Sequence, residues 1–241
     1  MSGFDPASVK ALTFDVFGTV VDWRGSIIAE GESYWRAKGI DIDWPAFADA
    51  WRGNYGPYMN KVRSAELGWT KLDDLHRMIL DDLIVQFGIA DKLSKDDVAH
   101  LNRVWHRLNA WPDVLPAFAA LKPRFILSTL SNGNVALLTK MAKHAGLPWD
   151  CILSGELCGH YKPDPQVYEM AWRLLDLEPG EVMMCAAHTN DLDAASKLGM
   201  RTAYIHRRDE SGPGRERPMP AADAYDVVVD DYTDLAKALL T

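Results

Sequence analysis

The segment ALTFDVFGTV, residues 11–20, combines a short apolar run with an aspartate and a glycine-threonine pair. A short run that alternates only in part is typical of a parallel strand buried on both faces. We therefore predict a strand over residues 11–15. Asp15 then stands at the carboxyl end of that strand, where ligands bind in open α/β sheets.

Similar short apolar runs recur along the chain, and longer amphipathic segments separate them. This alternation predicts an α/β fold with a doubly wound parallel sheet and right-handed crossovers. Gly146 and Gly199 stand where two of the helices should end. The further predicted strands are 125–130, 182–187, 202–205 and 226–229, and the predicted helices are 135–145, 165–175 and 192–198.

The stretch from about residue 23 to residue 108 breaks the alternation and is typical of helices almost throughout. We interpret it as a helical cap domain, 23–108, inserted into a core domain made of 1–22 and 109–241. Pro45 and Ser94 suit helix starts, whereas Gly56-Pro57 should end or kink a helix. One apolar face of that helix is made of Trp51, Tyr55, Tyr58, Met59 and Val62.

Composition limits the class of protein. The 241 residues carry 34 acidic and 26 basic side chains, so the formal net charge is −8, which argues against nucleic acid or an anionic membrane as partner. No apolar run approaches the roughly 20 residues of a membrane span. The first residues show no export signal, and three cysteines without a CxxC pair suit reduced thiols. We therefore expect a cytoplasmic protein.

Residues 207–224 should form a surface loop.

Groups capable of chemistry follow the predicted strands. Asp15 ends the first strand, Ser131 the second, and Asp191 lies just beyond the third. Lys162 lies in the loop before the helix 165–175. A carboxylate, a hydroxyl, an ammonium and a second carboxylate should thus meet at one edge of the sheet. Simpler roles stay open, because Asp15, Ser131 and Asp191 could each cap a helix and Lys162 could be a surface lysine.

These segments resemble the motifs of the haloacid dehalogenase superfamily, and within it the chain looks most like the type II 2-haloacid dehalogenases. The matching residues are DVFGT at 15–19, LSNG at 130–133, YKPD at 161–164 and Asn190-Asp191. The phosphatases of that superfamily carry a second Asp where this chain has Phe17, and a magnesium-binding Asp where it has Ala186. The resemblance thus implies a Rossmann-like core and a hydrolase of carbon–halide bonds that needs no metal and no organic cofactor.

The resemblance also implies a mechanism in two steps. Asp15 displaces halide from a short 2-haloacid and forms an ester, which water hydrolyses to a 2-hydroxy acid. Lys162 keeps Asp15 ionised, and Asp191 holds Lys162 and helps to place the water. Ser131 and Thr19 hydrogen-bond the substrate carboxylate or Asp15, with Tyr168 in support.

The leaving halide requires donors, which family members supply from an asparagine and a cap arginine. Asn132 matches the asparagine, and we choose Arg52 as the arginine, with Arg36 and Arg63 as alternatives. A solvated arginine is the simpler interpretation of Arg52. His188 replaces the asparagine of a common Ser-Ser-Asn motif, so it could position water, act as a base or narrow the pocket. The predicted substrate site is completed by Val16, Phe17 and Asn190.

Two other functions remain open. A phosphatase or phosphonate hydrolase of the same superfamily is disfavoured by Phe17 and Ala186. A non-catalytic relative that binds a small acid or a protein is disfavoured by the retained set of Asp15, Lys162 and Asp191. The resemblance also allows a homodimer.

Overall fold

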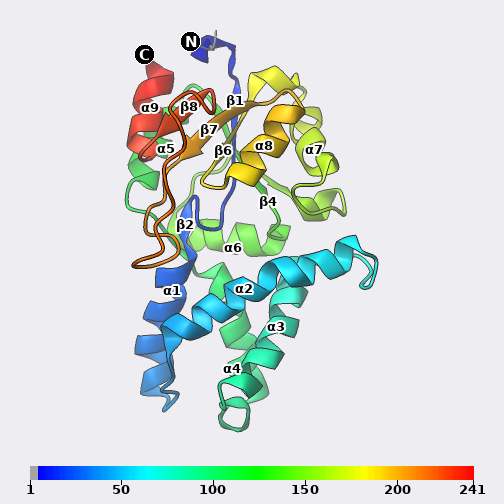
Figure 1. Cartoon of the computed structure of the whole chain (residues 1–241), viewed down its shortest axis with the longest axis vertical. Helices are drawn as coiled ribbons and strands as arrows, with labels where there is room; N and C mark the ends of the chain where they lie inside the picture. The colour runs from blue at the N-terminus through cyan, green and yellow to red at the C-terminus, as the bar shows by residue number, and fades with distance from the viewer. Residues whose placement is uncertain (1–4) are drawn as a thin grey trace.

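The computed structural model describes residues 5–241, and it consists of a sheet flanked by helices and a second, helical half (Figure 1). Six parallel strands have the order β5-β4-β1-β6-β7-β8. This order places β1 at the centre, where the connections turn to opposite sides, and such switch points hold the ligand sites of doubly wound sheets. The strands are β1 (Ala11–Phe14), β4 (Ile126–Ser131), β5 (Cys151–Ser154), β6 (Val182–Ala186), β7 (Arg201–Ile205) and β8 (Val227–Val229).

Helices cover both faces of this sheet, as the doubly wound fold requires. On β1, Leu12 and Phe14 pack in the cluster that includes α5, α6 and α9, whereas Ala11 packs in the cluster of α7 and α8. Burial on both faces explains the nearly continuous apolar runs of the sequence. The helices are α5 (Val114–Leu121), α6 (Val135–Ala145), α7 (Pro165–Leu175), α8 (Thr189–Lys197) and α9 (Tyr232–Leu240), with turns η1 (Pro6–Ser8), η5 (Gly155–Leu157) and η6 (Pro179–Glu181).

The helical half, defined here as residues 23–106, lies beyond the carboxyl ends of β1 and β4 (Figure 1). A two-stranded antiparallel ribbon of β2 (Val21–Asp22) and β3 (Asn109–Ala110) forms where the chain enters and leaves it. This ribbon lies beside the predicted boundaries, although the division into domains stays a prediction. The helices are α1 (Trp23–Glu30), α2 (Trp44–Arg63), α3 (Leu72–Gln86) and α4 (Lys95–Asn102), with turns η2 (Gly31–Trp35), η3 (Ala90–Lys92) and η4 (Arg103–His106).

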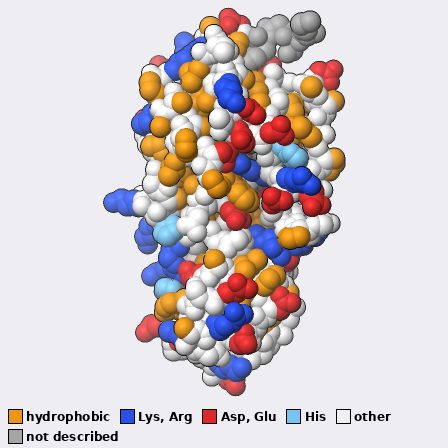
Figure 2. Space-filling view, turned by 90° about the vertical axis from the view of Figure 1, so that its left-hand side faces the viewer, with side chains coloured by type: hydrophobic (Ala, Val, Ile, Leu, Met, Phe, Trp, Pro, Cys, Tyr) orange, Lys and Arg blue, Asp and Glu red, His pale blue; other side chains and the backbone are white. Residues whose placement is uncertain are grey.

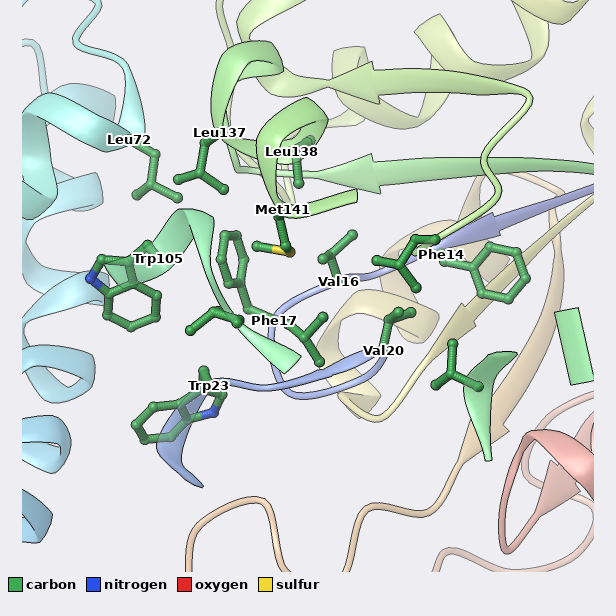
Figure 3. Close-up of a cluster of buried hydrophobic side chains, with 14 of the residues drawn as sticks. Phe14, Val16, Phe17, Val20, Trp23, Leu72, Trp105, Leu137, Leu138 and Met141 are labelled. Carbon is green, nitrogen blue, oxygen red and sulfur yellow. The ribbon is translucent and has the colours of Figure 1, made fainter. Parts of the chain in front are cut away.

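Aromatic side chains pack the joint between the two halves (Figure 3). Phe17 follows β1 and meets Trp105 edge to face, with ring centroids 5.8 Å apart. Trp105 in turn stacks on Trp23 at 6.4 Å and on His76 at 4.2 Å. These four rings form an aromatic wall, which shields one side of the carboxyl edge of the sheet from solvent.

Most predicted elements are confirmed. Helices 135–145 and 165–175 have the predicted bounds, and Gly146 ends the first with a φ of 70°. The sequence prediction missed β5. Of the two effects predicted for Gly56-Pro57, ending the helix is wrong, since α2 continues to Arg63, and a kink stays a prediction. Residues 207–224 contain no helix or strand, as predicted. The predicted core begins with residues 1–4, which lie outside the described residues. Within residues 5–241, no helix combines the length and apolarity that crossing a membrane requires.

Candidate active site

Asp15 directly follows β1, and its buried carboxylate is the centre of the candidate site. The chain turns back at once, because Gly18 adopts a φ of +85° that glycine reaches without strain. This turn brings the Thr19 hydroxyl to 2.7 Å from Asp15 Oδ2, to which it donates, while it accepts from the Ala187 amide at 3.0 Å. Thr19 thus fixes the orientation of the Asp15 carboxylate.

Lys162 joins the two carboxylates of the site. Its Nζ donates to Asp15 Oδ1 at 3.0 Å and also to Asp191 Oδ2. The other oxygen of Asp191 accepts from the Tyr168 hydroxyl at 2.6 Å. Lys162 precedes α7, Tyr168 lies on it and Asp191 lies in the first turn of α8, so three separate elements meet here.

His188 follows β6 on the other side of Asp15. Its Nδ1 lies 2.8 Å from Asp15 Oδ2, and its Nε2 lies 3.1 Å from Glu210 Oε1. Glu210 belongs to the irregular loop after β7 and is only 2% exposed. The site therefore contains a third buried carboxylate that the sequence did not predict.

These contacts set the charges of the site. Burial opposes ionisation of Asp15, but Lys162 and His188 outweigh it and hold the pKa of Asp15 far below its usual value. Burial would lower the pKa of Lys162, but the charges of Asp15 and Asp191 raise it above the usual value. Burial also opposes the charge on His188, yet Glu210 and Asp15 raise its pKa to about 9. Near neutral pH, Asp15 is thus an anion between two cations.

Asp15 lines a cavity of about 320 Å³ that lies between the sheet and α2. On the face shown in Figure 2, charged side chains of both signs gather around mid-height. The N-termini of α6 and α8 start near this edge of the sheet, and their positive ends favour an anion. The cavity is lined by Asp15, Phe17, Arg52, Tyr55, Gly56, Met59, Asn60, Arg63, Asn132, Lys162, Pro163, Tyr168, His188, Asn190 and Asp191.

The three candidate arginines have different surroundings. Arg52 lines the cavity, with its guanidinium 4.5 Å from the Tyr55 ring centre and 5.7 Å from that of Trp23, and no carboxylate of residues 5–241 pairs with it. Arg63 also lines the cavity, but it donates to the Lys162 carbonyl and pairs with Asp164 at 3.5 Å. Arg36 pairs with Asp41 at the surface, away from the cavity.

The side-chain carbonyl of Asn132 already has a hydrogen-bond donor within the protein. Its Oδ1 accepts from the Lys162 backbone amide at 2.7 Å, which orients the side chain. Its Nδ2 faces the Met59 sulfur at 3.4 Å, and a thioether is a weak acceptor. The Asn132 side chain also interacts with the Tyr55 hydroxyl. Arg52 and Asn132 thus both present donors at the cavity wall, and Arg52 has no carboxylate partner among the described residues.

Three predicted site residues do not line the cavity. Thr19 acts through Asp15, as described. Ser131 is fully buried at the end of β4, where its hydroxyl accepts from the Gly133 amide at 3.1 Å. Val16 is fully buried in the hydrophobic cluster of Figure 3. Direct contact of Ser131 or Val16 with a substrate stays a prediction.

The sequence prediction missed Glu210, Tyr55 and Met59 as residues of the site. Tyr55 and Met59 were assigned to the apolar face of α2, and their helical spacing gives no sign that this face borders a cavity. Glu210 lies in RRDESGPGRERP, where charge and proline predict a solvated loop. Only its buried contact with His188 distinguishes it from neighbouring charges.

No group of three or more His, Cys, Asp or Glu side chains within residues 5–241 has the geometry of a metal site. Phe17 and Ala186 are the residues that argue against a phosphatase in the resemblance drawn from the sequence. Phe17 packs against Trp105, and Ala186 is fully buried in β6.

Comparisons with known proteins agree with this geometry. A family model described as haloacid dehalogenase-like hydrolase matches residues 9–199, so the chain belongs to this family of hydrolases. It is 46% identical to an L-2-haloacid dehalogenase of known crystal structure, with a TM-score of 0.92 and coverage of 96% of this chain and 99% of the other. A defluorinating L-2-haloacid dehalogenase is 42% identical, with a TM-score of 0.91 and coverage of 97% and 96%.

A curated relative is also similar over most of its length. It is (S)-2-haloacid dehalogenase 1 of Pseudomonas sp. (strain CBS-3), which is 27% identical over 212 residues, covering 83% of this chain and 85% of that protein. The similarity therefore extends over both halves of the molecule.

Proposed function

We propose that this protein hydrolyses short 2-haloacids to 2-hydroxy acids through an ester on Asp15. The observation that carries the proposal is an ionised Asp15, held by Lys162 and His188, that opens onto a cavity with the unpaired Arg52 in its wall. The names of the relatives support this choice of substrate class.

In the first step, a lone pair of Asp15 attacks the carbon that carries the halogen. A carbon–oxygen bond forms, the carbon–halogen bond breaks, and halide leaves with the bonding electrons. In this proposal, Arg52 and the Asn132 amide, which both line the cavity, stabilise that developing anion. Lys162 keeps Asp15 ionised and therefore nucleophilic.

In the second step, water attacks the carbonyl carbon of the ester. The ester bond breaks at that carbon, so the product hydroxyl oxygen comes from Asp15 and the water oxygen remains in the carboxylate. One proton is released for each substrate hydrolysed. The sheet half and the helical half both line the cavity, and we propose that residues 23–108 act as a cap over the core.

The most direct test measures halide release from chloroacetate in the presence of EDTA. We expect turnover that EDTA does not reduce and that Asp15→Asn abolishes. Activity that requires Mg²⁺, or turnover of p-nitrophenyl phosphate instead, would favour the phosphatase alternative. Fluoro- and bromoacetate and both 2-chloropropionate enantiomers then define the halogen and stereochemical preference.

Two further proposals concern the location of the protein in the cell and its oligomeric state. The three cysteines are free thiols in the structure, which suits the cytoplasm. A homodimer is proposed from the resemblance to the family alone, and size-exclusion chromatography with light scattering would test it.

A further inference from the structure

Glu210 makes contacts that a loop carboxylate rarely makes. It reaches the floor of the site from the irregular segment after β7 and is 2% exposed. Its Oε1 lies 3.1 Å from His188 Nε2 and accepts from Trp23 Nε1 at 3.3 Å. Burying a carboxylate costs free energy unless it is paired, so these partners are needed to hold it there.

The turn after Asp15 leaves room for this carboxylate. A Cβ atom at Gly18 would lie 2.1 Å from Glu210 Oε1. The glycine next to the nucleophile therefore serves two purposes, since it allows the positive φ and vacates the space that Glu210 fills.

The second step of the proposed reaction needs a base for the attacking water, and the structure limits the choice. Both oxygens of Asp191 are engaged, one by Lys162 and one by Tyr168. Asp15 itself carries the ester at that stage. His188 lines the cavity with Nδ1 turned toward Asp15, so a water that approaches the ester carbon from this side meets an imidazole nitrogen.

We propose that Glu210 is a positioning residue, which holds the Nε2 proton of His188 so that Nδ1 is the nitrogen that accepts a proton from the hydrolytic water. This inference rests on the proposed function. The arrangement Asp15–His188–Glu210 uses a buried carboxylate to fix the orientation and tautomer of a histidine, which is the role of the carboxylate in catalytic triads.

The charges explain how His188 changes from cation to base during the cycle. In the free enzyme, the carboxylates of Asp15 and Glu210 face the two nitrogens, and the imidazolium is favoured. Ester formation neutralises Asp15, so one of the two stabilising charges is lost and the pKa of His188 falls. The Nδ1 proton then passes to solvent. When water attacks the ester carbonyl, one proton of that water replaces it on Nδ1, and the other ends on the ester oxygen that leaves as the hydroxyl of the product, so that Asp15 is restored as a carboxylate.

Charged groups on other elements also act on this pair, among them the Asp22 carboxylate before α1, which Glu210 repels. Lys162 lies on the far side of Asp15, and the Arg217 guanidinium is 3.4 Å from Glu210 Oε2. Burial of Glu210 opposes its ionisation, but His188, Arg217 and Arg52 outweigh burial and lower the pKa of Glu210 in the free enzyme. Arg217 and Arg52 keep their charges when His188 loses its proton, so they still favour the Glu210 anion at that stage.

The test separates the two chemical steps in Glu210→Gln, which keeps the shape and removes the charge. In a single turnover with chloroacetate, we expect halide release within about 3-fold of wild type. Formation of the hydroxy acid should be about 100-fold slower, as for loss of general-base assistance. Intact-protein mass spectrometry should then detect the accumulated ester. Glu216→Gln, an exposed matched change in the same loop, should behave as wild type.

The pH profile and a double variant distinguish positioning from a merely structural role. In wild type, ester hydrolysis should rise with pH until His188 is neutral. In Glu210→Gln this rise should move to lower pH, because the anion that favours the imidazolium is gone. Glu210→Asp keeps the charge and should restore the wild-type pH position with an intermediate rate. Adding Glu210→Gln to His188→Gln should cause no further slowing.

Other results would overturn the inference. Equal slowing of halide release and ester hydrolysis in Glu210→Gln would indicate a structural role, as would full additivity with His188→Gln. Wild-type hydrolysis rates and pH profile in Glu210→Gln would show that the carboxylate has no role. If Glu210→Gln does not fold, the rate and pH profile of Glu210→Asp decide in the same way. Absence of halide release by the wild-type enzyme would instead refute the proposed function.

Discussion

Arg52 is a half-buried arginine without a carboxylate partner among residues 5–241. Arg63, on the same helix, is tied to the Lys162 carbonyl and to Asp164, and this fixes the loop that carries Lys162. Arg52 instead lies against the rings of Tyr55 and Trp23. Aromatic faces orient a guanidinium but do not neutralise it, so its charge remains available to an incoming anion.

We expect Arg52→Met to slow halide release from chloroacetate at least about 100-fold, the scale of losing one preorganised donor to a developing anion. Ion chromatography of released chloride measures this directly. Arg36→Met is the matched control, since Arg36 lies at the surface and pairs with Asp41. A loss in Arg36→Met with none in Arg52→Met would reverse our assignment.

Residues that follow predicted strands or belong to a recognisable motif could be predicted, and a residue in a loop without either could not. Asp15 and Asp191 follow strands whose carboxyl ends meet at one edge, and Lys162 lies in the YKPD motif; the three side chains meet as expected. Glu210 depends on the path of a loop without regular structure, and no periodicity encodes that path. Its contact with His188 is therefore visible only in three dimensions.

At the scale of elements, α2 shows that packing can maintain a helix through a proline. Pro57 removes a backbone hydrogen bond to the carbonyl four residues earlier, at Gly53. Both residues are exposed, so water can satisfy that carbonyl while the buried face of α2 continues to pack. Strand β5 was missed because its four residues, Cys151–Ser154, are too few to show a pattern that distinguishes a strand from a loop.

Helix α3 carries a buried histidine that makes stability depend on pH. Burial lowers the pKa of His76 from 6.5 to about 3. Below pH 6.5 the unfolded chain therefore binds a proton that the folded chain does not, and stability is lost as the pH falls. Between pH 7 and pH 5 this group alone should cost about 2 kcal/mol.

We expect His76→Leu to remove that part of the pH dependence. Urea unfolding at pH 7 and pH 5 should show a free energy of unfolding that falls less in the variant, by about 2 kcal/mol. His144→Leu on α6 is the control and should keep the wild-type loss, because His144 is exposed to water in the folded protein. Identical losses in wild type and His76→Leu would contradict this role of His76.

At the scale of the whole molecule, a polar clamp joins the two halves beside the aromatic wall. Asn134, before α6, accepts from the Asp73 amide at 3.2 Å and donates to the Asp73 carboxylate at 3.0 Å. His106 Nε2 contacts the other oxygen of Asp73 at 2.8 Å. The contacts of Asn134 with Asp73 hold α3 against the sheet half.

Asn134→Ala leaves the amide and one oxygen of Asp73 without these partners. We expect it to lower the free energy of unfolding by about 1–3 kcal/mol, the cost of unsatisfied buried polar groups. Chemical denaturation measures this. Asn54→Ala removes only a bond within α2 to Ala50 and should change stability by less than about 0.5 kcal/mol. Equal effects of the two variants would argue against the clamp.

The overall charge of −8 is compatible with an anionic substrate, because the local field at the cavity is different. Asp191, Lys162, Asp15, His188 and Glu210 form a chain in which negative and positive groups alternate. Arg52 and the N-termini of α6 and α8 add positive potential beside it. Composition predicted the total charge, but only the fold shows how the charges are arranged around the cavity.

The central claim is that Asp15, rather than water, attacks the substrate carbon, and a single turnover in H₂¹⁸O tests it most directly. With enzyme in excess over chloroacetate, we predict a product hydroxyl that contains ordinary oxygen and an Asp15 carboxylate that gains one ¹⁸O, located by peptide mass spectrometry. A product that carries ¹⁸O from its first turnover, with Asp15 unlabelled, would contradict the account.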